Sequence, residues 1–149
     1  MTDSPQRAEA MFLEGFNCAQ SVLACCGEGR GISRELAIRV AQAFGGGIGR
    51  TGNLCGALTG AMMAIGLKHA AIDAADGASK ARAYDVAQTV LAEFEKRNGW
   101  LLCRDLIGCD LRTAEGQRQF KESGAHQKIC AKAVRIAAEI VEEALARTS

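Results

Sequence analysis

Sulfur is the most reactive chemistry that this chain offers. Seven cysteines occur in 149 residues, an odd number for structural pairing. In a reducing compartment thiols stay reduced, so a cysteine-rich intracellular chain indicates metal ligation or redox chemistry before structural disulfides. Cysteine also packs well as a small apolar residue, and about two or three of the seven are expected to do only that. The seven are Cys18, Cys25, Cys26, Cys55, Cys103, Cys109 and Cys130.

The cysteine with the most distinctive surroundings is Cys55, which lies in the glycine-rich stretch FGGGIGRTGNLCGALTG at 44–60. Gly47, Gly49 and Gly52 form a literal G-x-G-x-x-G, which binds dinucleotides only between a strand and a helix. Here the preceding residues have a helical period, and no Gly-Lys-Ser/Thr follows that would make a phosphate-binding loop. The glycines therefore predict a sharp turn and a close backbone approach, not a nucleotide site.

The position of Cys55 predicts a reactive thiol. We expect Asn53 to cap a helix in which Cys55 is the second residue. Free N–H groups and the helix dipole favour an anion there, so the thiol should ionise readily and act as a nucleophile or metal ligand. We also expect the backbone at Gly52, Asn53 and Gly56 to contact a cofactor bound at the sulfurs. The alternative is that Cys55 is a small buried residue.

The cysteines near the N-terminus differ in their expected roles. Cys18 falls at the edge of a helical apolar stripe, where it can face a pocket between helices. Cys25 follows on nearly the same face about 10 Å along the axis, too far for a disulfide with Cys18. Cys26 falls on the stripe and is expected in the core.

The later cysteines lie in two settings. Cys103 and Cys109 flank DLIG in an irregular region, where ligands are often presented. Cys130 lies on the apolar stripe of the last helix, so its periodicity favours the core, although His126 four residues earlier could share its face as a ligand pair. No C-x-x-C occurs, so thioredoxin and zinc-ribbon spacings are excluded.

Composition narrows the class of protein. The chain is 48% hydrophobic and 23% charged with a formal net charge of +1, which excludes a disordered chain and the basic surface of a nucleic-acid binder. The start lacks a signal-peptide pattern, so a cytoplasmic location is expected. The longest apolar run, 54–67, is shorter than the roughly 20 residues that a bilayer span needs. One domain over 1–149 is expected.

Helical periodicity dominates the chain, and no segment alternates as a strand would. The pattern predicts an all-α bundle of about five main helices. In the second of these helices, Leu36, Val40 and Phe44 are expected to form the buried face. The main helices are predicted at 4–26, 33–44, 54–71, 79–98 and 125–146, with short turns around 101–106 and 114–122.

Four segments make the chain similar to a known family. GFNCAQSVL, FGGGIGRTGNLCGALTGA, CRDLIG and KICAKAV, spread between residues 12 and 130, resemble the CGAxxG cysteine family of redox-active proteins. The resemblance implies an all-helical domain whose thiols gather at one place, with Cys109 as a substitute for Cys103 if the spacing differs. The cysteines that match the family positions are Cys18, Cys55, Cys103 and Cys130.

The resemblance also implies a cofactor, because a similar domain occurs with an iron–sulfur centre in the split-Soret type of multi-haem cytochrome. This chain has no C-x-x-C-H, so no covalent haem is expected. Four thiolates are the usual ligands of a cluster. The leading hypothesis is an electron-transfer or redox-sensing protein that binds an iron–sulfur cluster, expected to be 2Fe-2S, through the four matched cysteines.

Two other functions fit the sequence. One is thiol-disulfide or peroxide chemistry with Cys55 as nucleophile and Cys18 or Cys103 as the resolving thiol. The other is a zinc-bound or metal-free helical interaction domain. The sequence does not decide whether the protein is an oxidoreductase or whether it forms a homo-oligomer. Its expected partner is another redox protein, with no nucleic acid and no membrane span.

Overall fold

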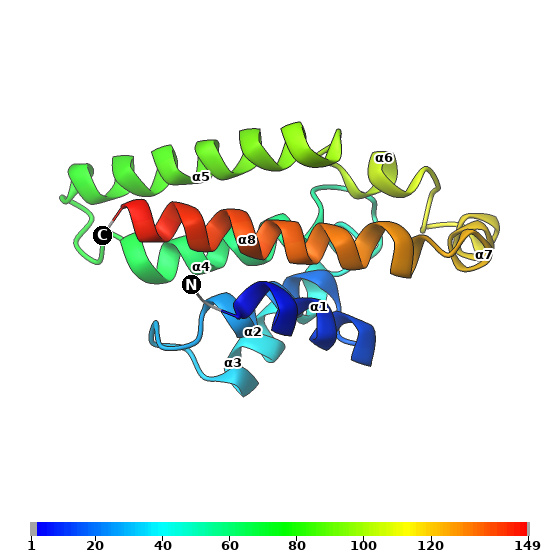
Figure 1. Cartoon of the computed structure of the whole chain (residues 1–149). Coiled ribbons are helices and arrows are strands. Elements are labelled where there is room, and N and C mark those ends of the chain that lie inside the picture. The colour runs from blue at the N-terminus through cyan, green and yellow to red at the C-terminus, as the bar shows by residue number, and fades with distance from the viewer. Residues whose placement is uncertain (1–2, 149) are drawn as a thin grey trace.

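Figure 1 shows the computed structural model of the chain, which describes residues 3–148. Regular structure in this range is helical, as predicted, apart from one antiparallel bridge between Leu54 and Leu102. A 3-10 turn at Gln42–Phe44 follows α3, and a π-helical turn at His126–Cys130 precedes α8. The helices are α1 (Ser4–Glu14), α2 (Cys18–Cys26), α3 (Arg34–Ala41), α4 (Gly56–His69), α5 (Gly77–Asn98), α6 (Cys103–Ile107), α7 (Ala114–Ser123) and α8 (Ala131–Arg147).

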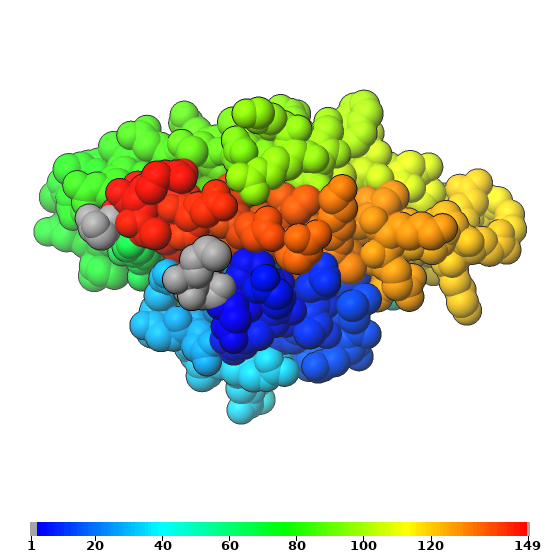
Figure 2. Space-filling view, in the orientation of Figure 1, coloured from blue at the N-terminus to red at the C-terminus, as the bar shows by residue number. Residues whose placement is uncertain are grey.

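The core forms around α8, which packs against α1, α2, α4 and α5. In Figure 1, α5 lies along one side of α8 and α1 and α2 lie along the other, with α3 beyond α2. Small and β-branched residues dominate the buried positions of α8, including Ala137, Val134 and Val141. The elongated shape in Figure 2 ends in α7, which projects beyond the bundle. No helix in the described range is long and apolar enough to cross a membrane.

The predicted first helix is in fact two helices, α1 and α2. Gly15 ends α1 with a φ of 122°. Asn17 then caps α2, because its side chain accepts the Gln20 N–H at 2.9 Å while the Gln20 side chain accepts the Asn17 N–H at 2.9 Å. Cys18 is therefore the first residue of a new helix. Periodicity had predicted a position in the middle of one long helix, and that prediction was wrong.

The predicted start of α4 was wrong by two residues, and Asn53 does not cap the helix. Cys55 itself occupies the cap position, and α4 begins at Gly56. The cause is a non-local pairing: the Cys55 N–H donates to the Leu101 carbonyl at 2.9 Å, and the Cys103 N–H donates to the Asn53 carbonyl at 2.7 Å. This pairing keeps the backbone extended up to Cys55.

Ser33 caps α3 as expected, but the face of α3 that carries its larger apolar side chains is not the buried one. Leu36 and Val40 are 48% and 45% exposed, while Ala37 and Ala41 are fully buried. Because α3 lies directly against α2, the side with methyl groups allows the closer approach, and the larger side chains face outward.

Candidate functional site

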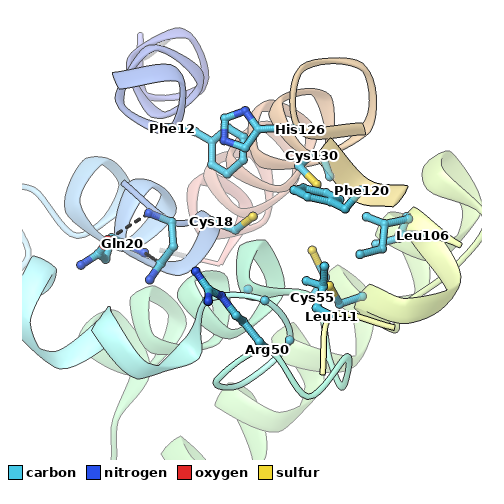
Figure 3. A pocket seen from close by; sticks show the side chains of 18 of the residues that line it. Phe12, Cys18, Gln20, Arg50, Cys55, Leu106, Leu111, Phe120, His126 and Cys130 are labelled. Atoms are coloured by element: carbon cyan, nitrogen blue, oxygen red, sulfur yellow. Dashed lines mark hydrogen bonds between the residues drawn. The ribbon is translucent and has the colours of Figure 1, made fainter. Parts of the chain in front are cut away.

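A pocket of about 540 Å³ lies between α1, α2, the glycine-rich loop, α6 and the start of α8. Four cysteines line it, one from each of four separate segments, and Figure 3 shows three of them, Cys18, Cys55 and Cys130, around the same space. Cys103 is the fourth. The structure therefore brings to one pocket the four positions that the resemblance selected.

The remaining cysteines lie elsewhere. Cys25 and Cys26 are buried in the core, and Cys26 is fully inaccessible, as its place on the apolar stripe predicted. Cys109 does not line the pocket, but its charge would raise the pKa of Cys103 and of Cys130, so it lies near both.

The loop before α4 makes a left-handed turn. Residues 46–50 all have φ between 59° and 68°, including Ile48 and Arg50, which are not glycines. The turn is closed because the N–H groups of Gly52 and Asn53 donate to the carbonyls of residues 46 and 47 at 3.1 and 2.9 Å. These two N–H groups are thus used inside the loop and do not contact the sulfurs, whereas Gly56 does line the pocket.

Two glycines allow the backbone to press against the cysteines. A Cβ added at Gly47 would lie 2.6 Å from the Cβ of Cys103, and one added at Gly56 would lie 3.0 Å from the Cβ of Cys18. Real side chains essentially never approach so closely, so only glycine fits at Gly47 without displacement. The glycine-rich motif therefore serves to position thiols.

Cys18 and Cys55 form an interacting pair. The interaction of the Cys55 thiol with the Cys18 side chain lowers the pKa of Cys55. The backbone N–H groups of Ala57 and Leu58 lower it further, against the opposing effect of burial. The same side-chain interaction raises the pKa of Cys18, and burial adds to the rise. Of the two thiols, Cys55 is therefore the one that loses its proton first as pH rises.

The other two pocket thiols stay protonated near neutral pH in the metal-free protein. Burial raises the pKa of Cys103 to about 12, and the nearby charge of Cys55 adds to this. The pKa of Cys130 is also raised to about 12 by burial, and then by the charges of Cys55 and Cys103. A ligand that needs thiolates must therefore displace their protons, so its binding is favoured by higher pH.

Cys130 lies in the pocket. Its periodicity had predicted a position in the core. It is the last residue of the π-helical turn, whose wider turn changes the register relative to α8 and leaves Cys130 half-buried. His126 in the same turn also lines the pocket, and its ring stacks on Phe12 with centroids 4.2 Å apart. Phe120 meets the His126 ring edge-on at 6.4 Å.

Several pocket residues did not stand out in the sequence. Phe12 and Phe120 look like ordinary apolar residues of amphipathic helices, and nothing local marks them. Arg50 had one signal, since it is the only charged residue in the stretch 44–60. Gln20 had another, since Asn and Gln three residues apart are typical of a capping box.

The fold and the pocket together define an all-helical protein in which cysteines from four segments form one thiol site. More specifically, this chain belongs to the family described as "Putative redox-active protein (C_GCAxxG_C_C)", whose model matches residues 16–144. The family label reads Gly-Cys-Ala where this chain reads Cys55-Gly56-Ala57, so the first two letters are exchanged. Neither the comparison with curated proteins nor that with solved structures gave a match.

The lowered pKa of Cys55 makes a pH-dependent prediction. In the reduced, metal-free protein one thiolate should form at a lower pH than in an ordinary cysteine, because a lowered pKa means that the proton leaves earlier as pH rises. Ultraviolet thiolate absorbance during a pH titration measures this. Cys55→Ser should remove the early step, whereas Cys109→Ser should keep it. An early step that survives in Cys55→Ser would contradict the assignment.

Proposed function

We propose that the protein is an electron-transfer or redox-sensing protein whose pocket cysteines bind an iron–sulfur cluster, expected to be 2Fe-2S. The observation that supports this most is the gathering of Cys18, Cys55, Cys103 and Cys130 on one pocket. Soft thiolates select iron–sulfur clusters, and four are their usual complement. A bound cluster would supply one-electron chemistry, which no side chain of the pocket supplies alone.

The arrangement of donors favours a cluster over a single zinc ion. Within residues 3–148, no three His, Cys, Asp or Glu side chains are placed to hold one metal ion. Structural zinc needs four ligands around one point, whereas each iron of a 2Fe-2S cluster needs only two protein thiolates.

The chain's own residues would support such a centre in three ways. The backbone N–H groups of Ala57 and Leu58, at the start of α4, stabilise negative charge on Cys55. Gly47 and Gly56 keep the backbone close against Cys103 and Cys18. Apolar side chains, among them Leu111, line part of the pocket, and their low polarity would tune the potential of a bound centre.

Anaerobic purification tests the proposal. The purified protein should be coloured and should contain iron and acid-labile sulfide in equal amounts, about two of each per chain for a 2Fe-2S cluster. Visible absorption and chemical analysis of iron and sulfide measure this. A colourless protein that takes up no iron after anaerobic reconstitution contradicts the cluster.

The interaction between the side chains of Cys18 and Cys55 favours a second candidate, thiol-disulfide exchange. The Cys55 thiolate would attack a substrate disulfide and release one substrate thiolate. The Cys18 thiol would then pass its proton to the released substrate thiolate, attack the mixed disulfide through its sulfur, form a Cys18–Cys55 disulfide and release the second substrate thiolate. Contact with Cys55 favours Cys18 over Cys103 as the resolving thiol. A Cys55 pKa near that of free cysteine, in the titration described above, would argue against this candidate.

A further inference from the structure

Arg50 is the one fixed charge on the wall of the cysteine pocket. Among the described residues that line the pocket there is no Asp, Glu or Lys. Figure 3 shows the Arg50 side chain extending from the glycine-rich loop toward the helix of Cys18 and Gln20. Within residues 3–148 its guanidinium takes part in no ion pair or hydrogen bond with a protein group. The pocket therefore has a cationic group available to a ligand.

The backbone at Arg50 has a conformation that is unfavourable for a residue with a side chain. Its φ is 65°, in the left-handed region that favours glycine, and its neighbour Gly49 has a φ of 59°. A side chain in this region costs about 1 kcal/mol relative to glycine. Ile48 shares this conformation with a φ of 68°, so the strain belongs to the loop as a whole, and strain of this kind gathers at functional sites.

The shape and lining of the pocket define the rest of the ligand. A volume of about 540 Å³ lies within the range of small-molecule sites, which is roughly 300–1,000 Å³. The stack of Phe12 on His126, with Phe120 at its edge, forms an aromatic wall, and Leu106 and Leu111 continue the apolar lining. Such a surface suits a flat or apolar molecular body.

We propose that the pocket admits a small organic anion with an aromatic or apolar body, whose acidic group pairs with Arg50 and whose body lies against the aromatic wall. This molecule would be the reactant of the thiol chemistry proposed above as the second candidate, so the inference rests on that candidate and not on the cluster. Guanidinium is suited to this task because its planar donors match a carboxylate in two parallel hydrogen bonds.

Two aromatic disulfides of different charge provide the probe. In each case a pocket thiolate attacks the disulfide, forms a mixed disulfide with the protein and releases one aromatic thiolate, whose absorbance gives the rate. Dithiobis(nitrobenzoate) carries two carboxylates, whereas dithiodipyridine is uncharged. The measured quantity is the rate with dithiobis(nitrobenzoate) divided by the rate with dithiodipyridine, in the reduced, metal-free protein. Mass spectrometry identifies the modified cysteine as Cys18 or Cys55.

The variants separate charge from folding. Arg50→Gln and Arg50→Gly should lower the rate ratio about fivefold, which corresponds to the largest effect usual for an exposed ion pair. High salt should lower the ratio in the wild type, because it screens the charge of Arg50. Arg50→Lys should retain most of the preference. Arg50→Gly also removes the left-handed strain, so it should fold at least as well as the wild type. Arg39→Gln, on the exposed side of α3 and outside the pocket, is the matched control.

Three outcomes overturn the inference: an unchanged ratio in Arg50→Gln and Arg50→Gly, an equal fall in Arg39→Gln, or pocket thiols that react with neither reagent. These are distinct from failure of the proposed function. A protein that binds iron but shows an unchanged ratio refutes only the anion site. A protein that binds no iron but loses its preference for the carboxylate reagent on Arg50 substitution refutes only the cluster.

Discussion

Replacing Cys18, Cys55, Cys103 or Cys130 singly by Ala is expected to abolish cluster binding. Each of these side chains lines the pocket, and a 2Fe-2S cluster that loses one thiolate leaves an iron under-coordinated. Because even residues that only support metal ligands change affinity by about 10- to 100-fold, loss of a ligand should reduce bound iron at least tenfold. Iron content per chain after anaerobic purification and reconstitution measures this.

The chain provides its own controls for this series. Cys25→Ala and Cys26→Ala remove buried sulfurs outside the pocket, so they report any general effect of destabilisation. Cys109→Ala removes the sulfur that lies near the site without lining it, and should retain iron. Equal iron loss in Cys26→Ala, or iron loss in Cys109→Ala with retention in Cys103→Ala, would refute the assigned set of four.

Gly47→Ala is expected to destabilise the protein by about 3 kcal/mol or more. Two effects add. The φ of 66° at this position is unfavourable for Ala by about 1 kcal/mol. In addition, the new methyl group would lie 2.6 Å from both the Asn53 carbonyl oxygen and the Cys103 Cβ, and the backbone there is held by the pairing with α6. Urea unfolding measures the loss, and iron binding should fall because Cys103 is displaced.

Gly49→Ala separates the two effects. Gly49 has nearly the same backbone conformation, with φ of 59°, but the nearest atom to an added Cβ is 3.9 Å away. It should therefore cost only the conformational part, about 1 kcal/mol, and leave iron binding intact. If the two variants lose equal stability, Gly47 is needed for its backbone angle alone and the loop does not hold Cys103 by contact.

Local sequence signals predicted much of the fold. Period and the end signal at Gly99 located the end of α5, whereas its start, which Asp76 caps, lies two residues before the predicted one. The short turns predicted around 101–106 and 114–122 correspond to α6 and α7. The four cysteines of the pocket were selected by motif resemblance, since periodicity had placed Cys130 in the core.

Features that depend on distant segments could not be predicted in the same way. The start of α4 is set by pairing between Leu54 and Leu102, which no local pattern encodes. The exposed face of α3 follows from its close approach to α2, where only Ala fits. The glycines of 44–60 indicated a tight turn, but that the turn is left-handed and includes Ile48 and Arg50 is visible only in the structure.

Anomalous X-ray scattering at the iron edge, from crystals of anaerobically purified protein, tests the central claim most directly. The account predicts iron density inside the pocket, bonded to the sulfurs of Cys18, Cys55, Cys103 and Cys130. Crystals of reconstituted protein with no iron density at the pocket, or with iron bound at other residues, would contradict it.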